Sequence, residues 1–183
     1  MKKSISYSIF TLLLAIVVTL LPGSLALAAI YNGYYWEQGP VDLLFLISDS
    51  VSDESWTGWY NAHEVWNEAD DSPTEFEYTE NDLIEIIYCD YGYDAQGNWD
   101  GITSYVGYPT ITYATVTMNE YKTDTYAYSE RVSVGAHEFG HVLGLGDHSG
   151  DYIMEHYTTI RWGTYTRYEP SEDDIEYVID LYD

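Results

Sequence analysis

Hydrophobic and polar residues follow two kinds of spacing along this chain, and together they predict an α+β fold. Short apolar runs rich in β-branched and aromatic residues are typical of strands with a buried face. Such runs occupy residues 41–48, 74–79, 83–91 and 111–119, and the stretch 90–101 is rich in turn-forming residues. We therefore expect a strand, a helix, several further strands and then two more helices.

Three segments repeat their apolar residues every three or four positions, which is typical of helices with one buried face. The first begins near Asp53, ends near Ala69, and carries Trp56, Trp59, Tyr60, His63 and Trp66 at this spacing. The last follows Ser171, a favoured N-cap residue, and has acidic residues in its first turn. Its apolar stripe consists of Ile175, Val178, Ile179 and Tyr182.

The middle helix, within residues 129–146, has two contrasting faces. At about 100° per residue, one narrow sector contains Val132, Ala136, Phe139 and Leu143, which predicts a core stripe. His137 and His141 lie roughly 140° to 180° away from that stripe, so they are expected to face a cleft. Gly144 is expected to end the helix, because a left-handed residue at this position is usually glycine.

Composition narrows the class of protein. The 183 residues are 46% hydrophobic and 17% aromatic, which is enough for one folded domain with its own core. With 31 acidic against 6 basic residues, the net charge of −25 disfavours nucleic acids and anionic membranes as partners. Cys89 is the single cysteine, so no intrachain disulfide forms, and its apolar surroundings predict a buried, inert thiol.

The first 28 residues have the pattern of a secretory signal peptide. Lys2 and Lys3 precede an uncharged apolar run, which ends before small residues with an A-x-A pattern at positions 26–28. The alternative is an uncleaved membrane anchor, although the run is shorter than the ~20 residues that span a bilayer. We expect a secreted, extracellular domain at residues 29–183, monomeric and without stable membrane association after cleavage.

The segment from His137 to His148 carries the candidate chemistry and fits H-E-x-x-H-x-x-G-x-x-D. Two histidines four residues apart on a helix can both reach one zinc ion. Glu138 lies too far around the helix to be a ligand, but it is placed to act as a general base on a metal-bound water. The motif therefore predicts a zinc site with His137 and His141 as ligands and Glu138 as the catalytic residue.

A catalytic zinc needs a third protein ligand, which the chain supplies after Gly144. Asp147 and His148 are the two candidates for this metal ligand. We prefer Asp147, because it keeps the spacing of the motif without an insertion.

These residues resemble the metzincin zinc endopeptidases, whose signature is H-E-x-x-H-x-x-G-x-x-H with a downstream Met-turn. HEFGHVLGLGDHS and PSEDDIEYVIDLY are similar to the zinc helix and the final helix of matrixins. Asp147 in place of the third histidine resembles the snapalysin-like variant. The resemblance implies that Met154 forms an apolar floor under the metal.

The resemblance also implies a fold and a reaction. The fold is a metzincin-like zincin fold, with a twisted, mostly parallel sheet, an antiparallel edge strand and three helices. Substrate proteins or peptides are expected to lie along the edge strand, which we place at residues 111–119. Hydrolysis is expected to use a zinc-bound water with Glu138 as the base. The alternatives are an acidic binding or adhesion domain without turnover, and a zinc hydrolase of non-peptide amides.

Other polar residues suggest further sites. His156 and Tyr157 follow the Met-turn, and a wall or specificity role is preferred to ligation. His63 is expected to be a packed or surface histidine rather than a ligand. Asp94, Asn98 and Asp100, with two glycines between and after them, could bind Ca²⁺, although a solvated turn explains them as well.

Overall fold

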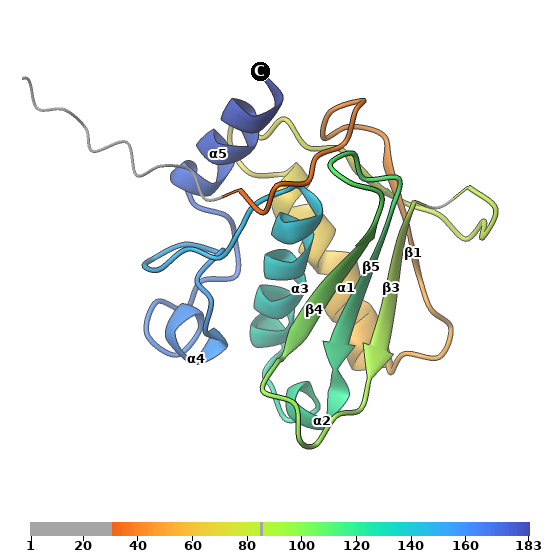
Figure 1. Cartoon of the computed structure of the whole chain (residues 1–183). Coiled ribbons are helices and arrows are strands. Elements are labelled where there is room, and N and C mark those ends of the chain that lie inside the picture. The colour runs from red at the N-terminus through yellow and green to blue at the C-terminus, as the bar shows by residue number, and fades with distance from the viewer. Residues whose placement is uncertain (1–30, 85) are drawn as a thin grey trace, which may run out of the picture.

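The computed structural model describes residues 31–84 and 86–183, so the predicted signal peptide lies outside the described residues. Within these residues, five strands form one sheet and five helices accompany it. Figure 1 shows how most of these elements are arranged. In chain order the elements are β1 (Leu43–Ile47), α1 (Asp53–Asn67), β2 (Phe76–Tyr78), β3 (Ile87–Gly92), β4 (Gly101–Val106), β5 (Tyr113–Asn119), α2 (Glu120–Thr123), α3 (Tyr128–Val142), α4 (Thr158–Arg161) and α5 (Glu172–Tyr182).

The sheet has the order β2-β1-β3-β5-β4, and β4 is its antiparallel edge strand. The α+β class with a mostly parallel sheet is therefore confirmed, with α2 and α4 as two short helices beyond the three expected. The prediction that 111–119 forms the edge was wrong, because β5 pairs with β3 on one side and with β4 on the other. β4 alternates half-buried and exposed residues without an apolar run, which is why its strand character was missed.

Helices α1 and α3 pack against each other and against the sheet (Figure 1). The predicted stripe of α3 is buried, with Ala136, Phe139 and Leu143 fully excluded from solvent. Trp66 of α1 donates its indole N–H to the carbonyl of Ala136 at 2.8 Å, so the polar group of this buried ring is satisfied. The core stripe of α3 thus turns His137 and His141 away from α1.

Gly144 ends α3 as predicted, with φ of +95°. The N–H of Gly144 donates to the carbonyl of His141 at 2.8 Å, and the N–H of Leu145 donates to that of Gly140 at 3.1 Å. These two bonds form the Schellman motif that reverses the chain at the end of a helix. A side chain here would also collide with the carbonyl of Tyr34, so both conformation and space require glycine.

α5 begins with a capping box and holds the loop that contains Met154. Ser171 accepts the N–H of Asp174 at 3.2 Å, and the Asp174 carboxylate accepts the N–H of Ser171 at 2.8 Å. The same carboxylate accepts the N–H of Ile153 at 2.9 Å. The predicted N-cap is confirmed, and the cap also fixes a loop far away in sequence.

Two single residues have the surroundings that the sequence predicted. Cys89 is fully buried in β3, and burial raises the pKa of its thiol well above the ordinary value. His63 is buried with its ring 4.8 Å from that of Phe45, and burial lowers its pKa. Both side chains are therefore packing residues. Among the described residues, no helix has the length and apolar character needed to cross a bilayer.

The close approach of α1 and α3 predicts that Gly135→Ala destabilises the protein by about 1–3 kcal/mol. A Cβ at Gly135 would lie 2.8 Å from the Cβ of Ala62, and neither atom can rotate away. The control is Gly58→Ala, whose Cβ meets its nearest neighbour at 3.3 Å. Urea unfolding measures both, and a Gly135→Ala protein as stable as the wild type would contradict this packing argument.

Candidate metal centre

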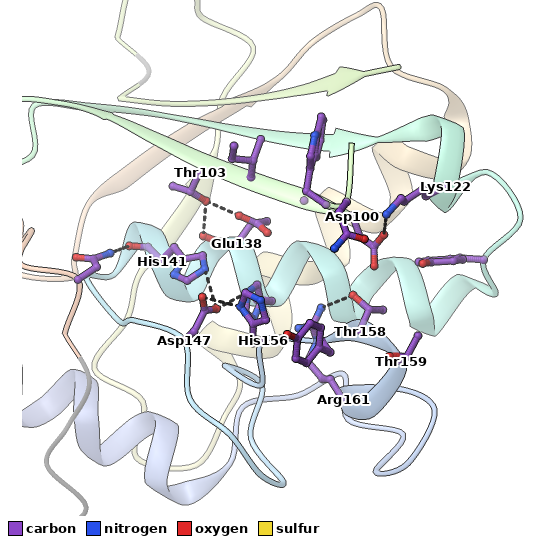
Figure 2. A pocket seen from close by; sticks show the side chains of 18 of the residues that line it. Asp100, Thr103, Lys122, Glu138, His141, Asp147, His156, Thr158, Thr159 and Arg161 are labelled. Atoms are coloured by element: carbon purple, nitrogen blue, oxygen red, sulfur yellow. Dashed lines mark hydrogen bonds and ion pairs between the residues drawn. The ribbon is translucent and has the colours of Figure 1, made fainter. Parts of the chain in front are cut away.

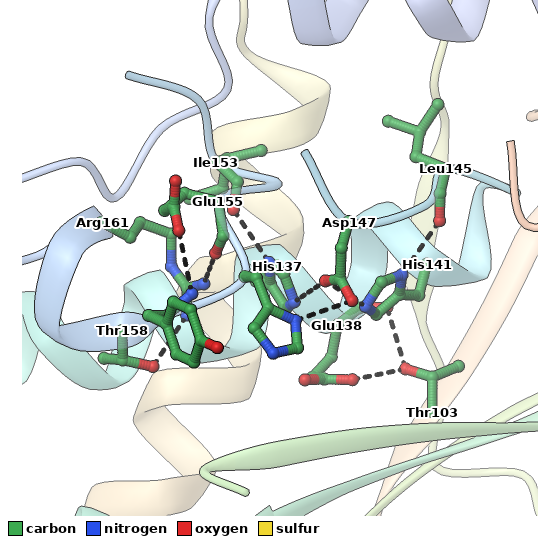
Figure 3. Close-up of polar contacts among 12 residues, drawn as sticks. Thr103, His137, Glu138, His141, Leu145, Asp147, Ile153, Glu155, Thr158 and Arg161 are labelled. Carbon is green, nitrogen blue, oxygen red and sulfur yellow. Dashed lines mark hydrogen bonds and ion pairs between the residues drawn. The ribbon is translucent and has the colours of Figure 1, made fainter. Parts of the chain in front are cut away.

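Three side chains converge where α3 ends and the chain turns back. The Nε2 atoms of His137 and His141 lie 3.4 and 3.6 Å from the same carboxylate oxygen of Asp147 (Figure 3). One ligand atom from each of the three residues lies within 4.8 Å of the others. The two histidines come from successive turns of α3, and the reversal at Gly144 returns Asp147 to them.

Both imidazoles are oriented by backbone carbonyls of the segment that follows α3. The Nδ1 atom of His137 lies 3.0 Å from the carbonyl oxygen of Ile153, and that of His141 lies 2.9 Å from the carbonyl oxygen of Leu145. A carbonyl can only accept a hydrogen bond, so Nδ1 of each ring is the protonated nitrogen. The lone pair on each Nε2 is then available for a metal, as in metal-ligating histidines generally.

The electrostatics of the three residues favour a cation. Burial lowers the pKa of His137 to about 3, helped by the positive charge of Arg161, so this imidazole is neutral at pH 7. Burial alone would raise the pKa of Asp147, but its contacts with the imidazoles of His137, His156 and His141 outweigh burial and lower it. A neutral nitrogen donor beside an ionised carboxylate is a donor set that suits zinc.

His148 lies apart from this cluster. Its ring is buried against Tyr152 at 4.2 Å and Tyr177 at 5.8 Å, and its backbone N–H donates to the carbonyl of Met154. Nδ1 of His148 has no hydrogen-bond partner among the described residues. Of the two candidates for the third ligand, the structure therefore brings only Asp147 together with His137 and His141.

Glu138 lies on the face of α3 that is turned toward β4 (Figure 2). Its carboxylate accepts a hydrogen bond from the hydroxyl of Thr103 at 2.7 Å. Gly101 allows the close approach of β4, because a Cβ there would come within 2.6 Å of the Glu138 Cγ. Burial raises the pKa of Glu138, while the charge on His141 and the Thr103 hydroxyl counteract this rise.

These groups open into one cavity of about 660 Å³ between β4, α3 and the segment that includes α4 (Figure 2). His137, Glu138, His141 and Asp147 line its floor, while Gly101 and Thr103 line the wall formed by β4. Thr158, Thr159 and Arg161 bound the cavity at its α4 side. Figure 2 shows α4 across the cavity from β4.

Comparison with known families agrees with this geometry. The matrixin family model, which describes a group of peptidases, matches residues 52–183. The chain belongs to the matrixin family. No curated protein matches the chain. Membership supports a zinc-dependent metalloprotease that hydrolyses peptide substrates, and its metzincin fold agrees with the sheet and helices described above.

The Met-turn segment of this matrixin packs against α3. Met154 is 1% exposed, and its sulfur lies against the bare Cα of Gly140 on α3. His156, from the next part of the segment, places Nδ1 2.9 Å from the second carboxylate oxygen of Asp147. Tyr157 is 54% exposed and lines the cavity. His156 therefore helps to orient Asp147, and Tyr157 forms part of the wall.

Several residues of this matrixin site were not found by sequence reasoning. Thr103 and Gly101 position Glu138 from a strand that had no apolar run. Asn32 donates its side-chain amide to the carbonyls of His141 at 3.1 Å and Leu145 at 3.2 Å, from more than one hundred residues away. Arg161 lines the cavity from α4. The only related signal in the sequence was the turn-rich segment 90–101, which includes Gly101 but did not indicate its contact with Glu138.

The loop considered for Ca²⁺ is satisfied by internal hydrogen bonds. One oxygen of Asp94 accepts the N–H groups of Gln96 and Gly97 at 2.9 and 2.8 Å, and the other lies 3.3 Å from the indole nitrogen of Trp99. Asp100 pairs with Lys122 at 3.6 Å. These contacts explain the acidic turn without an ion, so calcium binding stays a prediction.

The low pKa of His137 predicts that the metal-free protein loses stability on acidification. An unfolded histidine titrates near pH 6.5, whereas folded His137 takes up a proton only near pH 3. Between these values the unfolded state binds more protons than the folded state. The free energy of unfolding therefore decreases as the pH is lowered, by at most about 1.4 kcal/mol per pH unit.

Urea unfolding of EDTA-treated protein between about pH 7 and 5 measures this slope in a range where ordinary carboxyl groups stay ionised. The slope is expected to be smaller in His137→Gln, which has no group that titrates at this position. Equal slopes in the two proteins would show that His137 does not carry the effect.

Proposed function

We propose that the chain is a secreted zinc-dependent endopeptidase with His137, His141 and Asp147 as metal ligands and Glu138 as general base. The observation that carries this proposal is the convergence of two Nε2 atoms and a carboxylate oxygen on the floor of a cleft, with a buried glutamate beside them. Family membership adds the reaction class. The predicted signal peptide at residues 1–28 supports export.

The three donors fit a catalytic zinc rather than a structural one. Structural sites use four protein ligands, whereas catalytic sites use three and leave one position open. The described part of the chain offers three residues in this cluster, and they open into the cavity. When bound, zinc supplies Lewis acidity, which lowers the pKa of a coordinated water and polarises a carbonyl group.

Glu138 supplies the proton transfers. Thr103 bonds to one carboxylate oxygen, so the other is free to take a proton from the attacking water and to deliver it to the departing amine. Burial raises the pKa of Glu138, which makes it a stronger base than an exposed glutamate while the Thr103 hydroxyl keeps it oriented. Both features come from the packing of β4 on α3.

The substrate is proposed to be an extended peptide that lies along β4. Among the described residues this strand pairs only with β5, so the backbone groups of its other edge can bond to a peptide strand. Ile102 and Thr103 of β4 line the cavity that contains the metal-site residues. The peptide chain would thus be held beside Glu138. Because hydrogen bonds to its backbone do not depend on its side chains, peptides of many different sequences would be accepted.

The first test is Glu138→Gln, which keeps the shape of the side chain but removes the base. The variant is expected to retain zinc and to lose about 10²–10⁴-fold in kcat/KM. The control is Glu130→Gln, in the first turn of the same helix and outside the cavity lining. Digestion of a mixed peptide library, with zinc analysis of each protein, measures both effects. Full hydrolysis by Glu138→Gln would overturn the assignment.

The second test separates the two candidates for the third ligand. Asp147→Ala is expected to lose most of its bound zinc, because only two ligands remain. His148→Ala is expected to keep it, because that ring packs against Tyr152 away from the cluster. Zinc is measured in dialysed samples of both variants, and retention in Asp147→Ala with loss in His148→Ala would reverse the ligand assignment.

A further inference from the structure

Arg161 is a buried cation at the boundary of the cleft. Its side chain is 1% exposed, yet it lines the cavity at the α4 side. Nε donates to the Ser133 hydroxyl at 2.9 Å, one terminal nitrogen to the Glu155 carbonyl at 2.5 Å, and the other to the Thr158 hydroxyl at 3.2 Å. All three acceptors are uncharged.

This guanidinium has no carboxylate partner among the described residues. None of the ion pairs in that part of the chain includes Arg161. The buried Glu155 carboxylate is occupied by the backbone N–H groups of Gly150 at 2.7 Å and Tyr157 at 3.2 Å. A guanidinium has five N–H donors, so each terminal nitrogen of Arg161 keeps one N–H beyond the contacts described.

A buried charge is normally paired, because desolvation is costly. Burial here lowers the pKa of Arg161 to about 10, which leaves it protonated at pH 7. The positive charge is therefore kept inside the protein at a position that borders the cavity. An anion in the cavity would supply the missing partner.

The distribution of basic residues points the same way. After the predicted signal peptide the chain has only four basic residues: Lys122, Arg131, Arg161 and Arg167. Two of the four, Lys122 and Arg161, line this one cavity. Lys122 is paired with Asp100 at 3.6 Å. Arg161 forms no direct ion pair among the described residues, and the carboxylates that favour its charged form, those of Glu138, Asp100, Asp147 and Glu155, act on it without such contact.

We propose that the α4 side of the cleft selects an acidic side chain of the substrate, whose carboxylate binds Arg161. This inference rests on the proposed function and assigns a substrate preference to the same site. Two parallel N–H groups of a guanidinium match a carboxylate well, and such charge-assisted hydrogen bonds are about twice as strong as neutral ones. A glutamate or aspartate close to the scissile bond is the group expected there.

The long-range field of the protein acts in the opposite direction. A net charge of −25 repels acidic peptides as a whole, so a preference for one carboxylate has to arise from local contact. The preferred peptide therefore has one acidic residue at a defined position in a neutral or basic background. Salt is expected to affect this preference little, because a buried pair is screened less than surface charges.

The test uses isomeric peptides that differ only in where a single glutamate stands. All are acetylated and amidated, so the glutamate side chain is the only carboxylate and the net charge is constant. The zinc-loaded wild type is expected to cleave the isomer with glutamate at one position near the scissile bond with roughly tenfold higher kcat/KM than the isomers with glutamate at either end. Mass spectrometry identifies the cleaved bond.

Variants separate recognition from a structural role of Arg161. Arg161→Met is expected to reduce the difference between isomers to about twofold, whereas Arg161→Lys keeps part of it through its charge. The control is Arg167→Met, which removes an arginine paired with Asp151 outside the cavity and should leave the ratio unchanged. A purely structural role would lower the rates for all isomers equally.

Binding provides a readout that does not need turnover or the Arg161 variants. Calorimetry with Glu138→Gln should show roughly tenfold tighter binding of the preferred isomer than of the end-substituted ones. Cleavage of all isomers at equal rates by the wild type would overturn the acidic preference and leave the endopeptidase intact. If no peptide is cleaved, the proposed function fails, and equal binding of all isomers would then overturn the preference as well.

Discussion

The reversal of the chain at Gly144 is the constraint on which the metal centre depends. An α-helix can present His137 and His141 on one face, but Asp147, six residues after His141, would lie on another face if the helix continued. The Schellman bonds at Gly140 and His141 end α3 within one turn of the second histidine. Asp147 can then lie beside both Nε2 atoms, whereas the ring of the adjacent His148 packs against Tyr152.

The segment after α3 both supplies a ligand and orients the others. The carbonyl of Leu145 fixes His141, and that of Ile153 fixes His137. The N–H of Ile153 is in turn held by Asp174 of α5, whose position depends on its own capping box with Ser171. A helix outside the cleft therefore determines the orientation of an imidazole on its floor. The precision of the site comes from backbone groups that local hydrogen bonds hold in place.

The sequence was sufficient to predict those features of the site that depend on residues close together in the chain. The stripe on α3, the helix end at Gly144 and the cap at Ser171 depend on neighbouring residues, so spacing and residue type were sufficient. The edge strand β4 was missed and 111–119 was wrongly placed at the edge, because strand order is a property of long-range pairing. Thr103, Asn32 and Arg161 reach the site only through tertiary contacts, and their residue types carry no local signal of that role.

A buried arginine lies close to a site that is expected to bind a metal cation, and the neighbouring charges explain how the two can coexist. Glu138 and Asp147 act electrostatically on Arg161 and favour its protonated form, while Arg161 in turn favours neutral His137 and ionised Glu138. Burial is the main cause of the lowered pKa of His137, and the arginine adds to it, so the imidazole stays unprotonated and available as a donor. The arginine also offsets part of the repulsion between two carboxylates in one pocket. Replacing that positive charge with an apolar side chain would therefore disturb the donor set as well as the wall of the cleft. For this reason the preference between peptide isomers, rather than the absolute rate, isolates what Arg161 contributes to recognition.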